Sequence, residues 1–164
     1  MSYQEKRTIV NIVFGVLILA AYCVYVFGAY QAHVAAPDDL KFFAAAMLKF
    51  IGIGVVVTIV VQVIFHILLS VAIAVKERDH DGKKIEKAVE AAVVEDEMDK
   101  LIGHKSARFG YAIAGAGFIA SLITLMLDYP AALMLNIIFL SFGAGSLAEG
   151  ALSLYYYRAG IRNG

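Results

Sequence analysis

Few side chains in this sequence could do chemistry, and the most specific of them lie inside its long apolar runs. Glu149 is the only acid and His66 the only histidine within those runs. A carboxyl group and an imidazole held together can share or pass on a proton, because histidine titrates near neutral pH. Each belongs to a row of polar or small residues at four-residue spacing, which places the row along one face of a helix. The rows are Thr58, Gln62, His66 and Ser70, and Ser141, Gly145, Glu149 and Ser153.

Four apolar runs must position these rows. Of the 164 residues, 61% are hydrophobic and only 17% are charged, whereas soluble domains average about 45–50% apolar and about 25% charged residues. Each run is long enough to cross a hydrocarbon core, which takes about 20 residues in a helix. We therefore expect an all-α fold, a transmembrane four-helix bundle that forms one membrane domain over residues 1–164. The spans are expected at about 8–30, 50–75, 109–127 and 131–157.

The second and fourth runs are expected to cross the membrane in the same direction, so their residues can be compared by depth. His66 lies ten positions before Lys76, and Glu149 lies nine positions before Arg158. At about 1.5 Å per residue, both would lie roughly 14–15 Å from the inner basic flank. Because a lipid-facing carboxylate costs several kcal/mol there, we expect Glu149 to face the bundle, with His66 as its partner. The predicted intramembrane polar site consists of Glu149, His66, Gln62, Thr58, Ser141 and Ser153.

The same residues also have a purely structural interpretation. Polar groups inside a bundle hydrogen-bond to one another, and small residues let two helices approach closely. The pairs Gly110–Ala114 and Gly117–Ser121 mark such contacts, either within one chain or between two chains. Replacing Glu149 with Gln separates the two interpretations, because the amide keeps its hydrogen-bonding capacity but cannot carry a proton.

The lysines and arginines are unevenly distributed between the two expected sides of the membrane. Of 14 lysines and arginines, only Lys41 and Lys49 lie between the first and second runs or between the third and fourth. Cytoplasmic loops carry the excess of lysine and arginine, so both termini and residues 76–108 are expected in the cytoplasm. No basic stripe stands clear of acidic residues, so direct nucleic-acid binding is not expected.

Several classes of function are disfavoured. Cys23 is the only cysteine, which excludes chemistry that needs a cysteine pair within one chain. One intramembrane histidine cannot supply the two axial ligands of a membrane haem, and His80 and His104 lack the spacing of metal ligands. No nucleophile, base and electrophile occur together, so an enzyme is not expected, nor is a cofactor or a metal.

Residues 76–108 are the only substantial segment expected outside the bilayer. Apolar residues recur there at helical spacing, first on one side of the helical wheel and then on the other. We therefore expect an amphipathic helical segment with a break near Glu95–Glu97, and Gly103 is a second candidate joint. These faces either pack under the bundle or on the membrane, or they dock a protein partner or a second copy. The docking residues would be Ile85, Val89, Val93, Met98 and Leu101.

Two short connections complete the layout. Residues 128–130 are too few to do more than join the third and fourth spans into an antiparallel hairpin. Asp38 or Asp39 is expected to cap a helix that runs through Lys41–Leu48 into the second span.

The entry to the third span carries a motif. Residues 95–102 are Glu-Asp-Glu-Met-Asp-Lys-Leu-Ile, and residues 105–108 are Lys-Ser-Ala-Arg. This stretch resembles the D-E-x-D-x-x-I/L-x-x-K-x-x-R segment of a family of small uncharacterised bacterial membrane proteins with about four spans. The resemblance covers the cytoplasmic helix and the third span. It implies a bacterial inner-membrane protein and carries no activity, although several such proteins accompany small helix-turn-helix regulators.

Together these observations favour a non-enzymatic membrane accessory, sensor or regulatory protein that acts through its cytoplasmic helical segment. The expected partners are the lipid bilayer and either a second copy of the chain or a protein at the cytoplasmic face. The alternative is a small oligomeric proton-coupled transporter or channel that uses Glu149 and His66.

Overall fold

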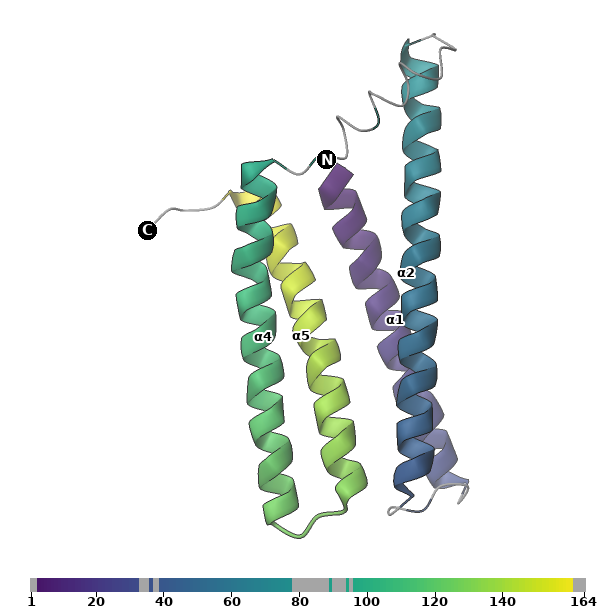
Figure 1. Ribbon diagram of the computed structural model, residues 1–164, viewed down its shortest axis with the longest axis vertical. Coiled ribbons are helices and arrows are strands. Elements are labelled where there is room, and N and C mark those ends of the chain that lie inside the picture. Colours follow the sequence, from purple (N-terminus) through teal and green to yellow (C-terminus); the bar gives the residue numbers. More distant parts are fainter. Residues whose placement is uncertain are drawn as a thin grey trace.

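The computed structural model describes residues 3–32, 39–77 and 96–160, together with residues 36, 89 and 94. The described residues form the helices α1 (Tyr3–Gln31), α2 (Leu40–Glu77), α4 (Glu97–Met126) and α5 (Ala131–Ala159) (Figure 1). All four are long and apolar enough to cross a membrane. The predicted all-α fold with four candidate spans is therefore confirmed. Within the expected cytoplasmic segment, residues 78–88, 90–93 and 95, which include Ile85 and Val93, lie outside the described residues.

The helices run up and down in one bundle. α5 packs against α4 along its length and also contacts α1, while α2 packs against α1 and α5 (Figure 1). Two side-chain contacts bring the start of α1, the start of α4 and the end of α5 to one end of the bundle, which we call the terminal end. Arg158 Nε donates to Glu5 Oε1 at 3.2 Å, and the Tyr157 hydroxyl donates to Asp99 Oδ1 at 2.9 Å.

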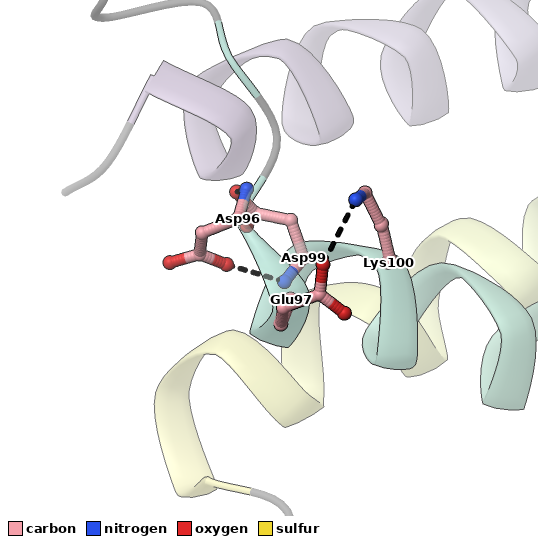
Figure 2. A network of polar contacts seen from close by, with 4 residues as sticks. All are labelled: Asp96, Glu97, Asp99 and Lys100. Atoms are coloured by element: carbon pink, nitrogen blue, oxygen red, sulfur yellow. Dashed lines mark hydrogen bonds and ion pairs between the residues drawn. The ribbon is translucent and has the colours of Figure 1, made fainter.

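The start of α4 is held by a capping box. The Asp99 backbone N–H donates to Asp96 Oδ1 at 2.7 Å, and the Asp96 backbone N–H donates to Asp99 Oδ2 at 3.2 Å (Figure 2). The two bonds satisfy N–H groups that a helix start otherwise leaves open, and the acidic first turn complements the helix dipole. α4 therefore begins at Glu97, within the range predicted for the break, while most of the helical part expected before it lies outside the described residues. The expected joint at Gly103 is wrong, because α4 continues as one helix to Met126.

The other connections follow local hydrogen bonding. The Phe42 backbone N–H donates to Asp39 Oδ1 at 3.0 Å, so Asp39 caps α2 as predicted. After α4, Asp128 takes a left-handed conformation with a φ of 60°. The Tyr129 N–H then bonds the Thr124 carbonyl oxygen at 3.1 Å, and the Asp128 N–H bonds the Leu125 carbonyl oxygen at 3.2 Å. This is a Schellman ending, and it turns the chain directly into the predicted α4–α5 hairpin.

Small residues bring α4 and α5 together. A Cβ atom on Gly110 would lie only 2.8 Å from the backbone oxygen of Gly145, and Gly117 packs directly against the side chain of Ser141. The predicted small-residue contacts of α4 are thus made within the chain. At the opposite end of the bundle, Tyr22 is buried among Phe43, Ala46, Met47 and Ala132.

Candidate functional site

A polar pocket opens at the terminal end between α1, α4 and α5. It has a volume of ≈ 430 Å³. α4 contributes its first turns, from Asp99 to Ala107, and α5 contributes Glu149 near the level of Gly110. The remaining polar side chains come from the beginning of α1 and the end of α5: Gln4, Arg7, Thr8, Asn11, Ser153 and Tyr157.

A second, larger cavity lies between α1, α2 and α5. This apolar groove has a volume of ≈ 900 Å³ and is lined mainly by aliphatic and phenylalanine side chains. Its few polar side chains are Thr58 of α2, Thr8 and Asn11 of α1, and Ser146, Glu149 and Ser153 of α5.

The two cavities meet at a small set of polar residues. Both are lined by Thr8, Asn11, Glu149 and Ser153, which we call the junction. Glu149 is half-buried there, and its Oε2 atom would be only 3.3 Å from a Cβ atom on Gly110. The single acid of the apolar runs therefore lies between a polar opening at the bundle end and an apolar groove on its side.

His66 does not lie at this junction. The Tyr3 and Phe65 rings are 6.0 Å apart, so the neighbouring His66 lies level with the first turn of α1. Glu149, by contrast, adjoins Gly150, which packs on Ile12. The nine positions from Tyr3 to Ile12 correspond to about 13 Å along a helix. His66 is exposed and lines neither cavity.

The expected meeting of Glu149 and His66 is therefore corrected. The comparison of depths assumed that Lys76 and Arg158 lie at the same height. α2 instead continues as one helix to Glu77 and rises beyond the start of α1 (Figure 1). Gln62 is also exposed and lines neither cavity.

The other predicted members of the site have different neighbours. Thr58 faces the apolar groove, and its hydroxyl donates to the Gly54 carbonyl oxygen at 2.8 Å. Ser141 lies against Gly117 of α4, and its hydroxyl donates to the Ile137 carbonyl oxygen at 2.6 Å. Ser153 lies at the junction beside Glu149. Of the six predicted residues, the structure thus gathers Glu149, Ser153 and Thr58 around the groove.

The predicted docking residues also separate. Met98 and Leu101 are exposed at the start of α4, whereas Val89 is buried. Ile102, next to Leu101, is buried as well, so this part of α4 has one covered and one open side.

The contribution of α1 was not predicted. Gln4, Thr8 and Asn11 line the polar pocket, and their spacing of four and three residues places them on one helix face. This spacing was the signal that could have identified them. Ser106 of α4 was also missed; it is fully buried, and its hydroxyl has no hydrogen-bond partner among the described residues. Within the same part of the chain, no three His, Cys, Asp or Glu residues are placed to hold a metal ion.

No protein-family model matches this chain, and no curated protein or solved structure matches it either. What the junction can bind is therefore argued from its own residues and their arrangement.

Proposed function

We propose that the protein is a non-enzymatic membrane sensor or regulatory protein that acts through the start of α4. One observation carries this proposal: the same turns of α4 have two different surfaces. Asp99, Gly103 and His104 line the polar pocket, while Met98 and Leu101 are open to the outside with exposed fractions of 50% and 39%. A change of occupancy or charge in the pocket therefore acts on the element that carries the apolar surface.

The apolar surface at the start of α4 suits a protein partner. Val94, which precedes the Asp96 cap, is also exposed, with an exposed fraction of 70%. Exposed apolar patches outside the lipid region are typical of docking surfaces. The lysine and arginine distribution supports a cytoplasmic position for this end of the bundle, and the resemblance carried by residues 95–108 supports a bacterial inner membrane.

The connection from the pocket to the docking surface is short. Asp99 both closes the capping box and accepts the hydroxyl hydrogen bond of Tyr157. The first turn of α4 is thereby tied to the end of α5, four residues from Ser153 at the junction. A displacement of α5 at the junction would move the start of α4, because α5 is one continuous helix from Ser153 to Tyr157 and Tyr157 is bonded to Asp99.

Co-purification tests the proposal. The full chain is isolated from its native membrane together with bound proteins, and the double variant Met98→Ser, Leu101→Ser is compared with the wild type. The matched control is Met126→Ser, which changes an exposed methionine at the other end of α4. We expect a specific partner to be lost from the double variant and kept by the control. Retention of all bound proteins by the double variant would contradict the proposal.

A small oligomeric proton-coupled transporter or channel is the second candidate. It is supported by the position of Glu149, which borders both cavities and is thus accessible from both. Vesicles that contain the protein should then show proton flux that is lost with Glu149→Gln. Because His66 lines neither cavity, His66→Gln should leave this flux unchanged. A wild-type protein that carries no flux would count against the transporter.

A further inference from the structure

We propose that the polar pocket and the apolar groove form one binding site for a single-chain amphiphile whose head is a primary ammonium group. The ammonium group lies at the junction beside Glu149, and the alkyl chain lies in the groove between α1, α2 and α5. This inference rests on the proposed function, since it names the class of molecule that the sensor detects.

The shape of the site requires a ligand with two different ends. The groove is mainly apolar, and its ≈ 900 Å³ volume is within the range of about 300–1,000 Å³ that is typical of small-molecule sites. The pocket that continues from it is rich in polar side chains. A purely apolar molecule would give the Glu149 carboxylate no polar partner. A purely polar molecule would leave the apolar groove empty. An amphiphile from the surrounding lipid leaflet satisfies both parts.

The residues at the junction select the head group. A half-buried carboxylate in an apolar span is stabilised by a cation or by several hydrogen-bond donors. An ammonium group supplies a positive charge and three donors. Beside Glu149, the oxygen atoms of Thr8, Asn11 and Ser153 can accept the remaining hydrogens. The Thr8 hydroxyl already donates its own hydrogen to the Gln4 carbonyl oxygen at 2.8 Å, so toward a ligand it acts as an acceptor.

The positive residues of the polar pocket do not replace this ligand. Lys100 Nζ is 3.0 Å from Glu97 Oε1, so the ammonium group of Lys100 is engaged at the start of α4. Arg7 lies on α1 between Glu5, which pairs with Arg158, and Ile12, which packs on Gly150. The backbone of Arg7 is therefore nearer the terminal end of the bundle than Glu149 is. An anionic head placed at the junction would lie beside the Glu149 carboxylate, which repels it.

Three probes with the same twelve-carbon chain test the head-group preference: dodecylammonium, dodecanol and dodecanoate. Each is titrated calorimetrically into the full chain in phosphatidylcholine nanodiscs, with identical protein-free nanodiscs to subtract partition into lipid. We expect saturable binding of one dodecylammonium per chain and weaker binding of dodecanol. The Glu149→Gln variant should bind dodecylammonium about tenfold more weakly, which corresponds to about 1.4 kcal/mol.

A second pair of variants tests the place of the alkyl chain. Ser146→Phe puts a ring into the groove, whereas Ala144→Phe puts the same ring on an exposed position of α5 that lines neither cavity. Dodecylammonium binding should weaken about tenfold or more with Ser146→Phe and stay near the wild-type level with Ala144→Phe.

Equal binding of the three probes, tightest binding of dodecanoate, or binding that is unchanged by Glu149→Gln would overturn the inference. If Glu149→Gln failed to fold, as judged by circular dichroism, the comparison of the three probes on the wild-type protein would decide. The titration contains no cytoplasmic partner, so its failure is distinct from a failure of the proposed docking at α4.

Discussion

The rings of Tyr3 and Phe65 meet edge to face, with their centroids 6.0 Å apart, and this contact shows how high α2 lies relative to α1. Twelve residues of α2 follow Phe65 before the helix ends at Glu77, so its last turns extend beyond the start of α1. Thr58 of α2, not His66, consequently lies beside the groove that Glu149 borders.

Cross-linking can check this helix register. On a Cys23→Ser background, the pair Tyr3→Cys and Phe65→Cys should be joined by a short bismaleimide reagent. The pair His66→Cys and Glu149→Cys should not be joined, because the two positions differ by about 12 Å or more in height. Joining of positions 3 and 65 is detected after a protease cut between α1 and α2, and joining of positions 66 and 149 after a cut between α2 and α4, because linked fragments then migrate as one band. Efficient joining of positions 66 and 149 would contradict the register.

The close approach of α4 and α5 predicts a strong effect of one methyl group. Gly110→Ala should destabilise the protein by about 1–3 kcal/mol, because the new Cβ would lie 2.8 Å from a backbone oxygen that cannot move alone. The control is Gly115→Ala in the same helix, where a Cβ meets nothing within 4 Å. That change should be neutral or stabilising, since alanine favours a helix. Thermal unfolding followed by circular dichroism measures both, and equal melting temperatures would argue against this interface.

A hydrogen bond joins α1 to α5 at the buried Tyr22. The Tyr22 hydroxyl donates to Asn136 Oδ1 at 2.6 Å, and Tyr22 is almost completely buried. Tyr22→Phe keeps the ring and removes this bond, so we expect a loss of about 0.5–1.5 kcal/mol in the free energy of unfolding. Tyr25→Phe, at an exposed position three residues later, is the control and should change little. The comparison uses unfolding in detergent at increasing denaturant concentration.

The turn after α4 predicts opposite effects of two small substitutions. Asp128 has a φ of 60°, a conformation that glycine adopts without steric cost. Asp128→Gly should therefore raise the melting temperature, whereas Asp128→Ala should lower it, each by an amount that corresponds to about 1 kcal/mol or less. If both variants melted at the same temperature, the left-handed residue would not be at position 128.

The sequence alone predicted the features that depend on neighbouring residues. The four candidate spans followed from hydropathy, because a hydrogen-bonded helix is what lets an apolar run cross lipid. The break near Glu95–Glu97 followed from the change of apolar face on the helical wheel, and the Asp39 cap followed from a side chain that bonds a backbone N–H three positions away. The hairpin turn and the small-residue face of α4 were equally local.

Only the tertiary structure decided which residues meet Glu149. Counting from the basic flanks placed His66 at the depth of Glu149, but α2 extends beyond the start of α1. The residues that line both cavities together with Glu149 are Thr8 and Asn11 of α1 and Ser153 of α5. The relative height of two helices depends on how their surfaces interlock, here through Tyr3 with Phe65 and Ile12 with Gly150. No local sequence pattern determines this height, because an apolar helix can shift along the membrane normal with little change in how well it is buried in lipid. Helices were thus a property of the sequence, and the site a property of their packing.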